Sequence, residues 1–318
     1  MPKRVVLIGH PVVQSLSSQL HQAAFDSKGI DARYEPNDVP LINLPDAIEA
    51  LRGNDHLGAN IAFPYKERVA PMVDRLTEDA QATGAVDTIT REGSRLVGHN
   101  TDVVGFRAAL DELIGRQKMP KNAVIIGAGG GARAAVYVLI TAGYQRVIVF
   151  NRHLHRAESL VRHFGKSASH MELRAMTWHE SVIEAELAKT KVLINASAVA
   201  DPATTSPVNA ELLPPELLVL DLIYWPRDTK LLRDARAAGA TETQNGDTML
   251  LHRTAAAFNL WTGMTIDIDV LRQQFDAARE GGGSPPAPAA PVAAEPAAEV
   301  AAAEADAVVT DPAVATSE

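Results

Sequence analysis

The chain contains no cysteine. A disulfide framework, a thiolate metal site and a cysteine nucleophile are therefore excluded. A basic run is also missing. The formal charge is −9, and residues 281–318 hold six acidic side chains and no Lys or Arg, which leaves −3 for residues 1–280. This nearly neutral body argues against nucleic acid or an anionic membrane as a partner.

Long hydrophobic runs are absent as well. The apolar segment 5–8 ends at Gly9, far short of a signal peptide or a membrane span, so we expect a cytoplasmic location. At 318 residues, with 46% hydrophobic and 22% charged side chains, the chain is long enough for two globular domains.

Strand-like and helical patterns alternate along the chain, which predicts an α/β fold. Helices are predicted at 16–25, 44–51, 102–114, 156–164, 229–238, 249–261 and 268–279, and strands at 5–8, 58–62, 123–126, 146–150, 191–195 and 217–222. Residues 281–318 are rich in Gly, Pro, Ala and acid without a sustained amphipathic period, which predicts a disordered tail. The alternative is an Ala-rich segment that binds a partner.

A glycine loop, Gly127-Ala128-Gly129-Gly130-Gly131-Ala132, follows a predicted buried strand and opens a predicted helix. It matches G-x-G-x-x-[G/A] in the context that gives the pattern meaning. Gly127 permits a tight turn, Gly129 lets the backbone approach a pyrophosphate, and Ala132 allows close packing of the helix. The helix N-terminus adds free N–H groups, to which Gly130 and Gly131 belong. We therefore predict a dinucleotide site; the alternative is a flexible glycine turn.

The cofactor preference depends on the residues that end the next strand. An NAD site usually has Asp or Glu there for the ribose hydroxyls. This chain has Asn151 and Arg152, with Arg156 just beyond. The two arginines can pair with a 2′-phosphate, which favours NADP over NAD. The alternative is that they are exposed side chains at the start of a helix.

Further segments, taken in order, resemble the shikimate dehydrogenase family over residues 4–275. They are Gly9-His10-Pro11-Val12 with Ser15 and Ser17, Asn60-Ile61-Ala62-Phe63-Pro64-Tyr65-Lys66, Gly84-Ala85-Val86-Asp87-Thr88-Ile89, Gly98-His99-Asn100-Thr101-Asp102, Asp221-Leu222-Ile223-Tyr224-Trp225-Pro226, and the run from Met249 to Gly263. The resemblance implies a substrate-binding domain over 1–104, completed by helices at 248–280. It also implies a Rossmann domain over 105–247 and an active site in the cleft.

The resemblance implies reversible hydride transfer between NADP(H) and a ring hydroxyl of shikimate or the ketone of 3-dehydroshikimate, a step of aromatic amino acid biosynthesis. Lys66 and Asp102 match the family's catalytic residues. Hydride loss from an alcohol also requires loss of the hydroxyl proton, which a Lys beside an Asp can accept. The alternative for the pair is a salt bridge between domains.

Other positions match the family's ligand contacts. Ser15 and Ser17 match the groups that hold the substrate carboxylate, although two such serines are often a helix cap. Asn60 and Tyr224 match substrate contacts. Asn195 and Met249 match the nicotinamide side of the cofactor site, although a Met at helical spacing is more often core packing.

The substrate side departs from the family at several positions, which include Gln14, Ser18 and Gln22 in place of the usual His, Pro and Asn. Ala62 stands where the family has Thr, Asp87 where it has Asn, and Arg253 where it has Gln. We count Asp87 and Arg253 among the substrate-binding residues, and their opposite charges suggest an ion pair between them.

We expect a small polyhydroxy ring carboxylate as partner, neither nucleic acid nor membrane, no metal, and a monomer or homodimer. Three alternatives stay open: a quinate or other altered-substrate dehydrogenase, a non-catalytic NADP-binding regulator of the same fold, and a methylenetetrahydrofolate dehydrogenase. Retention of both Lys66 and Asp102 argues against the regulator.

Overall fold

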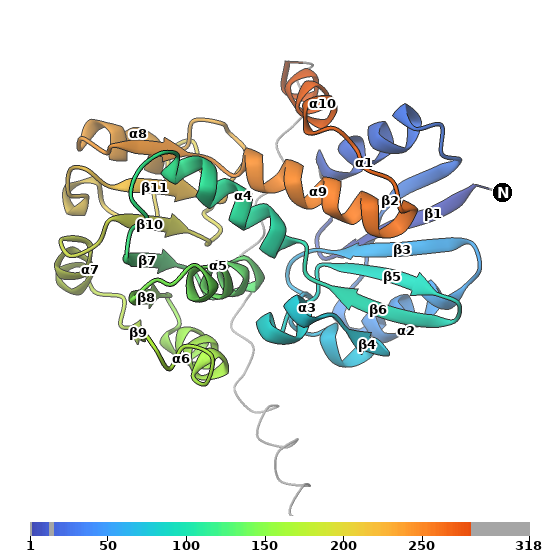
Figure 1. Ribbon diagram of the computed structural model, residues 1–318, viewed down its shortest axis with the longest axis horizontal. Coiled ribbons are helices and arrows are strands. Elements are labelled where there is room, and N and C mark those ends of the chain that lie inside the picture. Colours follow the sequence, from blue (N-terminus) through green and yellow to red (C-terminus); the bar gives the residue numbers. More distant parts are fainter. Residues whose placement is uncertain (1, 13–15, 281–318) are drawn as a thin grey trace, which may run out of the picture.

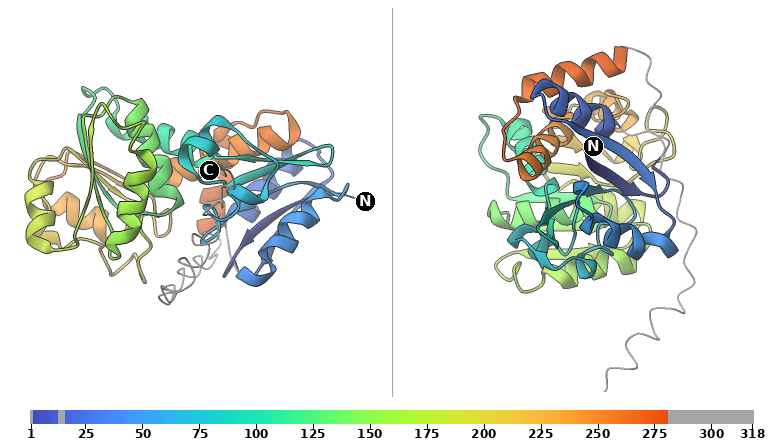
Figure 2. Two further views of the ribbon diagram at one scale, coloured as in Figure 1. Left: turned by 90° about the horizontal axis from the view of Figure 1, so that it is seen from below. Right: turned by 90° about the vertical axis from the view of Figure 1, so that its right-hand side faces the viewer.

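The computed structural model describes residues 2–12 and 16–280, and these form two lobes, each built on a six-stranded sheet (Figure 1, Figure 2). The first sheet has the order β2-β1-β3-β5-β6-β4. Its strands are β1 (Lys3–Gly9), β2 (Ala32–Asp38), β3 (His56–Ile61), β4 (Arg75–Leu76), β5 (Thr88–Glu92) and β6 (Arg95–His99). β1 runs parallel to β2 and β3, whereas β5 is antiparallel to both of its neighbours.

Alternate residues of β1 enter two different cores, as the two-residue period of a strand requires. Val5 and Leu7 pack against α1, α9 and α10, whereas Val6 and Ile8 face the core that contains α2. The helices of this lobe are α1 (Leu16–Ser27), α2 (Leu44–Glu49), α3 (Glu78–Thr83), α9 (Asp247–Thr262) and α10 (Ile268–Glu280). Both faces of the sheet are therefore covered.

Sequence patterns predicted β1 and β3 but missed β2 and the hairpin of β5 and β6. In the hairpin, Glu92 pairs with Arg95 across a two-residue turn, and Gly93 has a φ of 66°. A Gly between two alternating apolar runs is a recognisable hairpin signal. In β2, Pro36 obscures the strand pattern.

The second sheet is entirely parallel, with the order β12-β11-β10-β7-β8-β9. Its strands are β7 (Asn122–Ile126), β8 (Arg146–Phe150), β9 (Glu172–Met176), β10 (Val192–Asn195), β11 (Leu218–Asp221) and β12 (Glu242–Gln244). Its helices are α5 (Gly130–Thr141), α6 (Leu154–Phe164), α7 (Glu180–Leu187) and α8 (Lys230–Ala237). This is the doubly wound order, in which ligands bind at the carboxyl ends of the strands where the order reverses, here between β7 and β10.

Two long helices, α4 (Asp102–Ile114) and α9, lie against each other between the lobes (Figure 1). Their contact is close at Gly105, where an added Cβ would lie 2.4 Å from the carbonyl oxygen of Met249. From there α9 continues onto α1, and α10 packs on α1 as well. Residues 247–280 thus return to the lobe in which the chain began.

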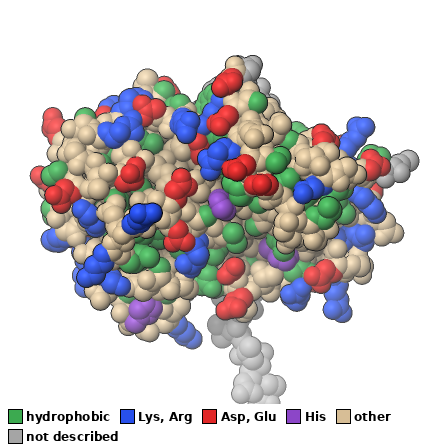
Figure 3. Space-filling model, turned by 45° about the horizontal axis from the view of Figure 1, so that its top comes forward, with side chains coloured by type: hydrophobic (Ala, Val, Ile, Leu, Met, Phe, Trp, Pro, Cys, Tyr) green, Lys and Arg blue, Asp and Glu red, His purple; other side chains and the backbone are tan. Residues whose placement is uncertain are grey.

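The predicted two-part α/β fold is confirmed. In the described part of the chain, no helix has the length and apolar character needed to cross a membrane. Side chains of both charges are intermingled over the face shown in Figure 3. The tail predicted for 281–318 lies outside the described residues.

Candidate active site

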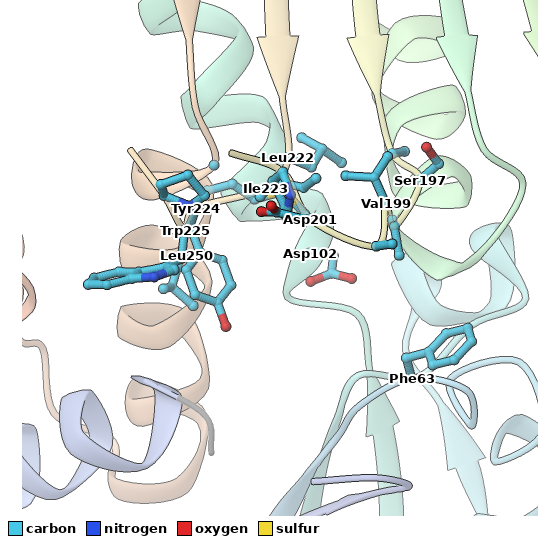
Figure 4. A pocket seen from close by; sticks show the side chains of 18 of the residues that line it. Phe63, Asp102, Ser197, Val199, Asp201, Leu222, Ile223, Tyr224, Trp225 and Leu250 are labelled. Atoms are coloured by element: carbon cyan, nitrogen blue, oxygen red, sulfur yellow. The ribbon is translucent and has the colours of Figure 1, made fainter. Parts of the chain in front are cut away.

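A cavity of about 690 Å³ lies between the lobes. The first lobe contributes Lys66 to its lining, α4 contributes Asp102, and α9 contributes Met249 and Arg253. The second lobe contributes the segments 196–203 and 222–226, which follow β10 and β11. Figure 4 shows Asp102 between the segment that carries Tyr224 and the loop that carries Phe63. The cavity therefore lies at the predicted edge of the parallel sheet.

The glycine loop connects β7 to α5 beside this cavity. Gly127 has a φ of 111°, and an added Cβ would lie 2.6 Å from the carbonyl oxygen of Ala196. At Gly130, an added Cβ would lie 2.8 Å from Cδ of Lys66, and Gly131 lines the cavity. Ala132 is fully buried in the core. Gly129 is the N-cap of α5 without a side-chain cap bond, so the first N–H groups of the helix are open to a ligand.

The predicted 2′-phosphate residues follow β8. The amide of Asn151 donates to the carbonyl of His153 at 2.9 Å, and Arg152 is exposed. Arg156, in the first turn of α6, lies 3.9 Å from a carboxylate oxygen of Glu67. Glu67 also pairs with the buried Arg133 of α5 at 3.0 Å. Sequence analysis did not single out Glu67 or Arg133.

Asn195 ends β10 with its side chain directed to protein partners. Its Nδ2 donates to Asp221 at 2.9 Å, and its Oδ1 accepts from the N–H and the hydroxyl of Ser197. It is fully buried and supports the loop that lines the cavity. Burial raises the pKa of Asp221 to about 6, although hydrogen bonds from Thr229, Ile223 and Asn195 oppose the shift. An Asp at the end of a predicted buried strand was the sequence signal that could have identified Asp221.

Lys66 and Asp102 form an ion pair and hydrogen bond inside the cavity. Lys66 follows β3, and Asp102 is the first residue of α4, with its side chain 1% exposed. The second carboxylate oxygen of Asp102 accepts from Nη1 of Arg253 at 2.8 Å. Burial alone would raise the pKa of Asp102, but the charges of Lys66 and Arg253 hold it well below its usual range.

Asp87 does not lie in the cavity wall, and the suggested ion pair between Asp87 and Arg253 is wrong, because Arg253 pairs with Asp102. The Asp87 side chain is buried under the N-terminus of α4. Its Oδ1 accepts from N–H and Oγ1 of Thr101, both at 2.8 Å, and its Oδ2 accepts from the N–H of Asp102. The carboxylate of Asp87 therefore accepts hydrogen bonds from backbone N–H groups at the start of α4.

Of the remaining predicted positions, Tyr224 lines the cavity, and Ser17 is buried near the start of α1. Ser15 lies outside the described residues. Asn60, at the end of β3, accepts from the hydroxyl of Tyr34 at 2.8 Å and donates to Thr88 at 2.9 Å. Met249 lines the cavity but is only 7% exposed.

His21 and Tyr34 form a buried, stacked pair of rings next to Asn60, and sequence analysis did not identify this pair. Their rings stack with centroids 4.6 Å apart. Burial, together with the positive charge of Arg253, lowers the pKa of His21 to about 3, although a hydrogen bond with Asn60 opposes the shift. His21 is therefore neutral at physiological pH. Among the described residues, no group of three or more His, Asp or Glu side chains is arranged to hold a metal ion.

Comparison with known proteins accounts for both lobes. Residues 7–89 match the shikimate dehydrogenase substrate binding domain, and residues 111–235 match the shikimate / quinate 5-dehydrogenase family. A shikimate dehydrogenase (NADP(+)) of Symbiobacterium thermophilum is 37% identical over 284 residues, covering 88% of this chain and 96% of the relative.

Two solved structures show the same fold. A shikimate 5-dehydrogenase of Thermus thermophilus in complex with NADP(H) and shikimate has a TM-score of 0.75 and 36% identity, covering 87% of this chain and 99% of that one. A quinate dehydrogenase of Corynebacterium glutamicum in complex with NAD has a TM-score of 0.77 and 30% identity, with coverage of 87% and 99%. The chain belongs to the shikimate dehydrogenase family.

Proposed function

We propose that the chain is an NADP-dependent shikimate dehydrogenase that interconverts a ring hydroxyl of shikimate and the ketone of 3-dehydroshikimate. The observation that carries the proposal is the Lys66–Asp102 pair, which lies in the cavity directly against the glycine loop at Gly130. A proton-transfer pair is thereby adjacent to a dinucleotide cradle. Binding alone has no need of such a pair, which argues against the regulator.

The residues present fit NADP. At Gly127 an added Cβ would collide with the loop after β10, and the N-terminus of α5 is left without a side-chain cap. Pyrophosphate binding uses this combination of close backbone and free N–H groups. In this proposal Arg152 and Arg156 pair with the 2′-phosphate, and Asn151 and Met249 are the other cofactor contacts. When bound, NADP supplies the hydride donor or acceptor.

Lys66 carries the proton in this proposal. In the reducing direction its ammonium group donates a proton to the carbonyl oxygen as hydride reaches the carbon, and in the oxidising direction the amine takes the hydroxyl proton. Asp102 holds the Lys66 Nζ in place and balances its charge. The Asp102 side chain is only 1% exposed, and burial strengthens its charge interaction with Lys66.

We further propose that residues 1–104 with 248–280 bind the substrate and that 105–247 bind NADP. The packing of α9 and α10 on α1 supports this division. Tyr224 and Arg253 line the cavity and contact the substrate directly. Ser17 and Ser15 hold its carboxylate. Asn60 supports the site indirectly, because its amide already forms hydrogen bonds with Tyr34 and Thr88.

The test is a steady-state assay of NADP and NAD reduction with shikimate, quinate and aminoshikimate as reductants. We expect the highest kcat/KM with NADP and shikimate. Absence of activity with all three compounds, in a protein that binds NADPH, would contradict the proposal. Preference for quinate would keep the hydride chemistry and assign the altered-substrate alternative, consistent with Ala62 and Arg253 at the substrate side.

A further inference from the structure

The carboxylate of Asp102 lies between two cations. One oxygen bonds Lys66 and the other accepts from Arg253 at 2.8 Å. The carboxylate side chain is 1% exposed, whereas the side chain of Arg253 is 25% exposed at the cavity wall. Rotation of the Asp102 side chain would break both ion pairs in a buried site, where unpaired charge is costly. Arg253 thus fixes the orientation of the carboxylate that Lys66 uses.

The backbone of Asp102 is held from the opposite side by Asp87. The Asp87 side chain accepts with both oxygens, taking the N–H of Thr101 on Oδ1 and the N–H of Asp102 on Oδ2. A carboxylate can accept at both ends, whereas an amide has one acceptor and one donor end. An Asn at position 87 would set its NH2 group against the N–H of either Thr101 or Asp102. The negative charge of Asp87 also complements the N-terminus of α4.

We propose that Arg253 and Asp87 are positioning residues that together hold Asp102 as a fixed, permanently ionised partner of Lys66, which leaves Lys66 as the sole proton carrier of the pair. The kinetic consequence rests on the proposed function. The coupling between Asp87 and Arg253 passes through Asp102, one residue holding its backbone and the other its side chain.

The charged groups that face Asp102 come from three segments. Lys66 follows β3, Asp87 precedes β5, and Arg253 comes from α9. Burial and the charge of Asp102 raise the pKa of Asp87, while Lys66 and Arg253 oppose that shift. His21, Tyr34 and Tyr224 also interact electrostatically with Arg253. Burial lowers the pKa of His21 to about 3 and raises the pKa of Tyr34, so both side chains are neutral. Replacing Arg253 by a neutral residue should therefore leave the charge of both neighbours unchanged.

The pH profile of kcat/KM tests Arg253. In wild type, kcat/KM should show no decrease at low pH from protonation of Asp102, an acid limb, above the pH at which the protein unfolds. Arg253→Gln and Arg253→Met remove a cation in contact with the carboxylate, so the pKa of Asp102 should rise by about one to three units and an acid limb should appear. Arg253→Lys keeps the charge and should leave the profile without that limb.

Asp87 is tested in the Arg253→Gln background. Removal of the neighbouring negative charge in Asp87→Asn should move the new acid limb back to lower pH, while kcat falls because the N–H of Asp102 loses its acceptor. Each single variant loosens the same residue, so the combined loss in kcat should be smaller than the product of the two single losses. If Arg253 and Asp87 had a merely structural role, the variants would lower activity, but Arg253→Gln would not move the acid limb to higher pH and added Asp87→Asn would not move it back to lower pH.

Arg146→Gln is the matched control. Arg146, the first residue of β8, is 18% exposed and pairs with Glu172 of β9 and Glu186 of α7. It is not among the residues that line the cavity. Its pH profile should follow wild type. An unchanged profile in Arg253→Gln, an acid limb in Arg253→Lys equal to that in Arg253→Gln, or fully multiplicative losses with Asp87→Asn would each overturn the proposal.

A measurement without turnover separates this inference from the proposed function. The ¹³C carboxyl resonance of Asp102, assigned by its loss in Asp102→Asn, can be titrated in the cofactor-free protein. We expect it to stay ionised throughout the titration in wild type and to titrate about one to three units higher in Arg253→Gln. That result, in a protein inactive with shikimate, would retain the positioning role and reject the activity. Identical titrations in both proteins would reject the positioning role even in an active enzyme.

Discussion

On the proposed cofactor side of the cleft, the candidate residues lie in one run of six residues, the glycine loop, and in a second short run after β8 that contains the arginines. On the substrate side, Lys66, Asp87, Asp102 and Arg253 come from four separate segments and meet through side chains. Backbone geometry is set by local sequence, so the first side can be identified from a motif. Side-chain pairing over 151 positions, as between Asp102 and Arg253, is set only by packing.

The difference predicts where each side tolerates change. Ligand binding at a site formed mainly by backbone groups depends on small residues that let the ligand approach and on the charge at a few exposed positions. A site made of buried ion pairs loses more when one member is removed, because the partner is left charged and unpaired. Three experiments test this contrast.

The largest effect is expected from Lys66→Met. It removes the proton carrier, and kcat should fall by about 10²–10⁴-fold, the usual contribution of a positioned acid–base group. NADPH affinity, measured by fluorescence titration, should stay within about twofold because the glycine loop is untouched. Lys166→Met on the surface near α6 is the control. A tenfold or greater loss of NADPH affinity in Lys66→Met would show that the two sides are not separable.

The next effect concerns Asp221, which supports Asn195 on the cofactor side. Because burial raises its folded-state pKa from 3.8 to about 6, its contribution to stability is present below pH 4 and is lost as the pH rises through about 6. A shift of about two units corresponds to about 3 kcal/mol.

Urea unfolding of wild type and Asp221→Asn from pH 4 to 8 measures this contribution. The free energy of unfolding of wild type should fall relative to the Asn variant across pH 4–6 and run parallel to it above that window. If the two curves of unfolding free energy against pH ran parallel from pH 4 to 8, the pKa of Asp221 would not be raised in the folded state.

The smallest effect is expected from Arg152→Gln combined with Arg156→Gln. Both arginines are exposed, so each ion pair with the 2′-phosphate should contribute about one kcal/mol, and KM for NADP should rise by about 10- to 100-fold in the double variant. KM for NAD, which lacks the 2′-phosphate, should stay the same. Arg162→Gln, also on α6, should change neither value. An equal rise for both cofactors would place the arginines outside the phosphate site.

Sequence patterns predicted the βαβ unit, the glycine loop and most helices because these depend on periodicity and on glycine at defined positions. They missed the β5–β6 hairpin, and they placed Asp87 in the substrate pocket. The error at Asp87 has a physical cause. A buried carboxylate next to a helix N-terminus binds the free N–H groups there. The sequence predicts a helix that begins at residue 102, but it does not show that this helix start lies next to residue 87.

The α/β class and the glycine loop could be predicted from the sequence because each depends on residues close together along the chain, and Lys66 and Asp102 were identified from the motifs that contain them. Only the tertiary structure decided that Arg253 reaches Asp102 and that Asp87 holds the N–H of Asp102. These contacts depend on how α9 packs against α4, with Gly105 allowing the helices to approach closely.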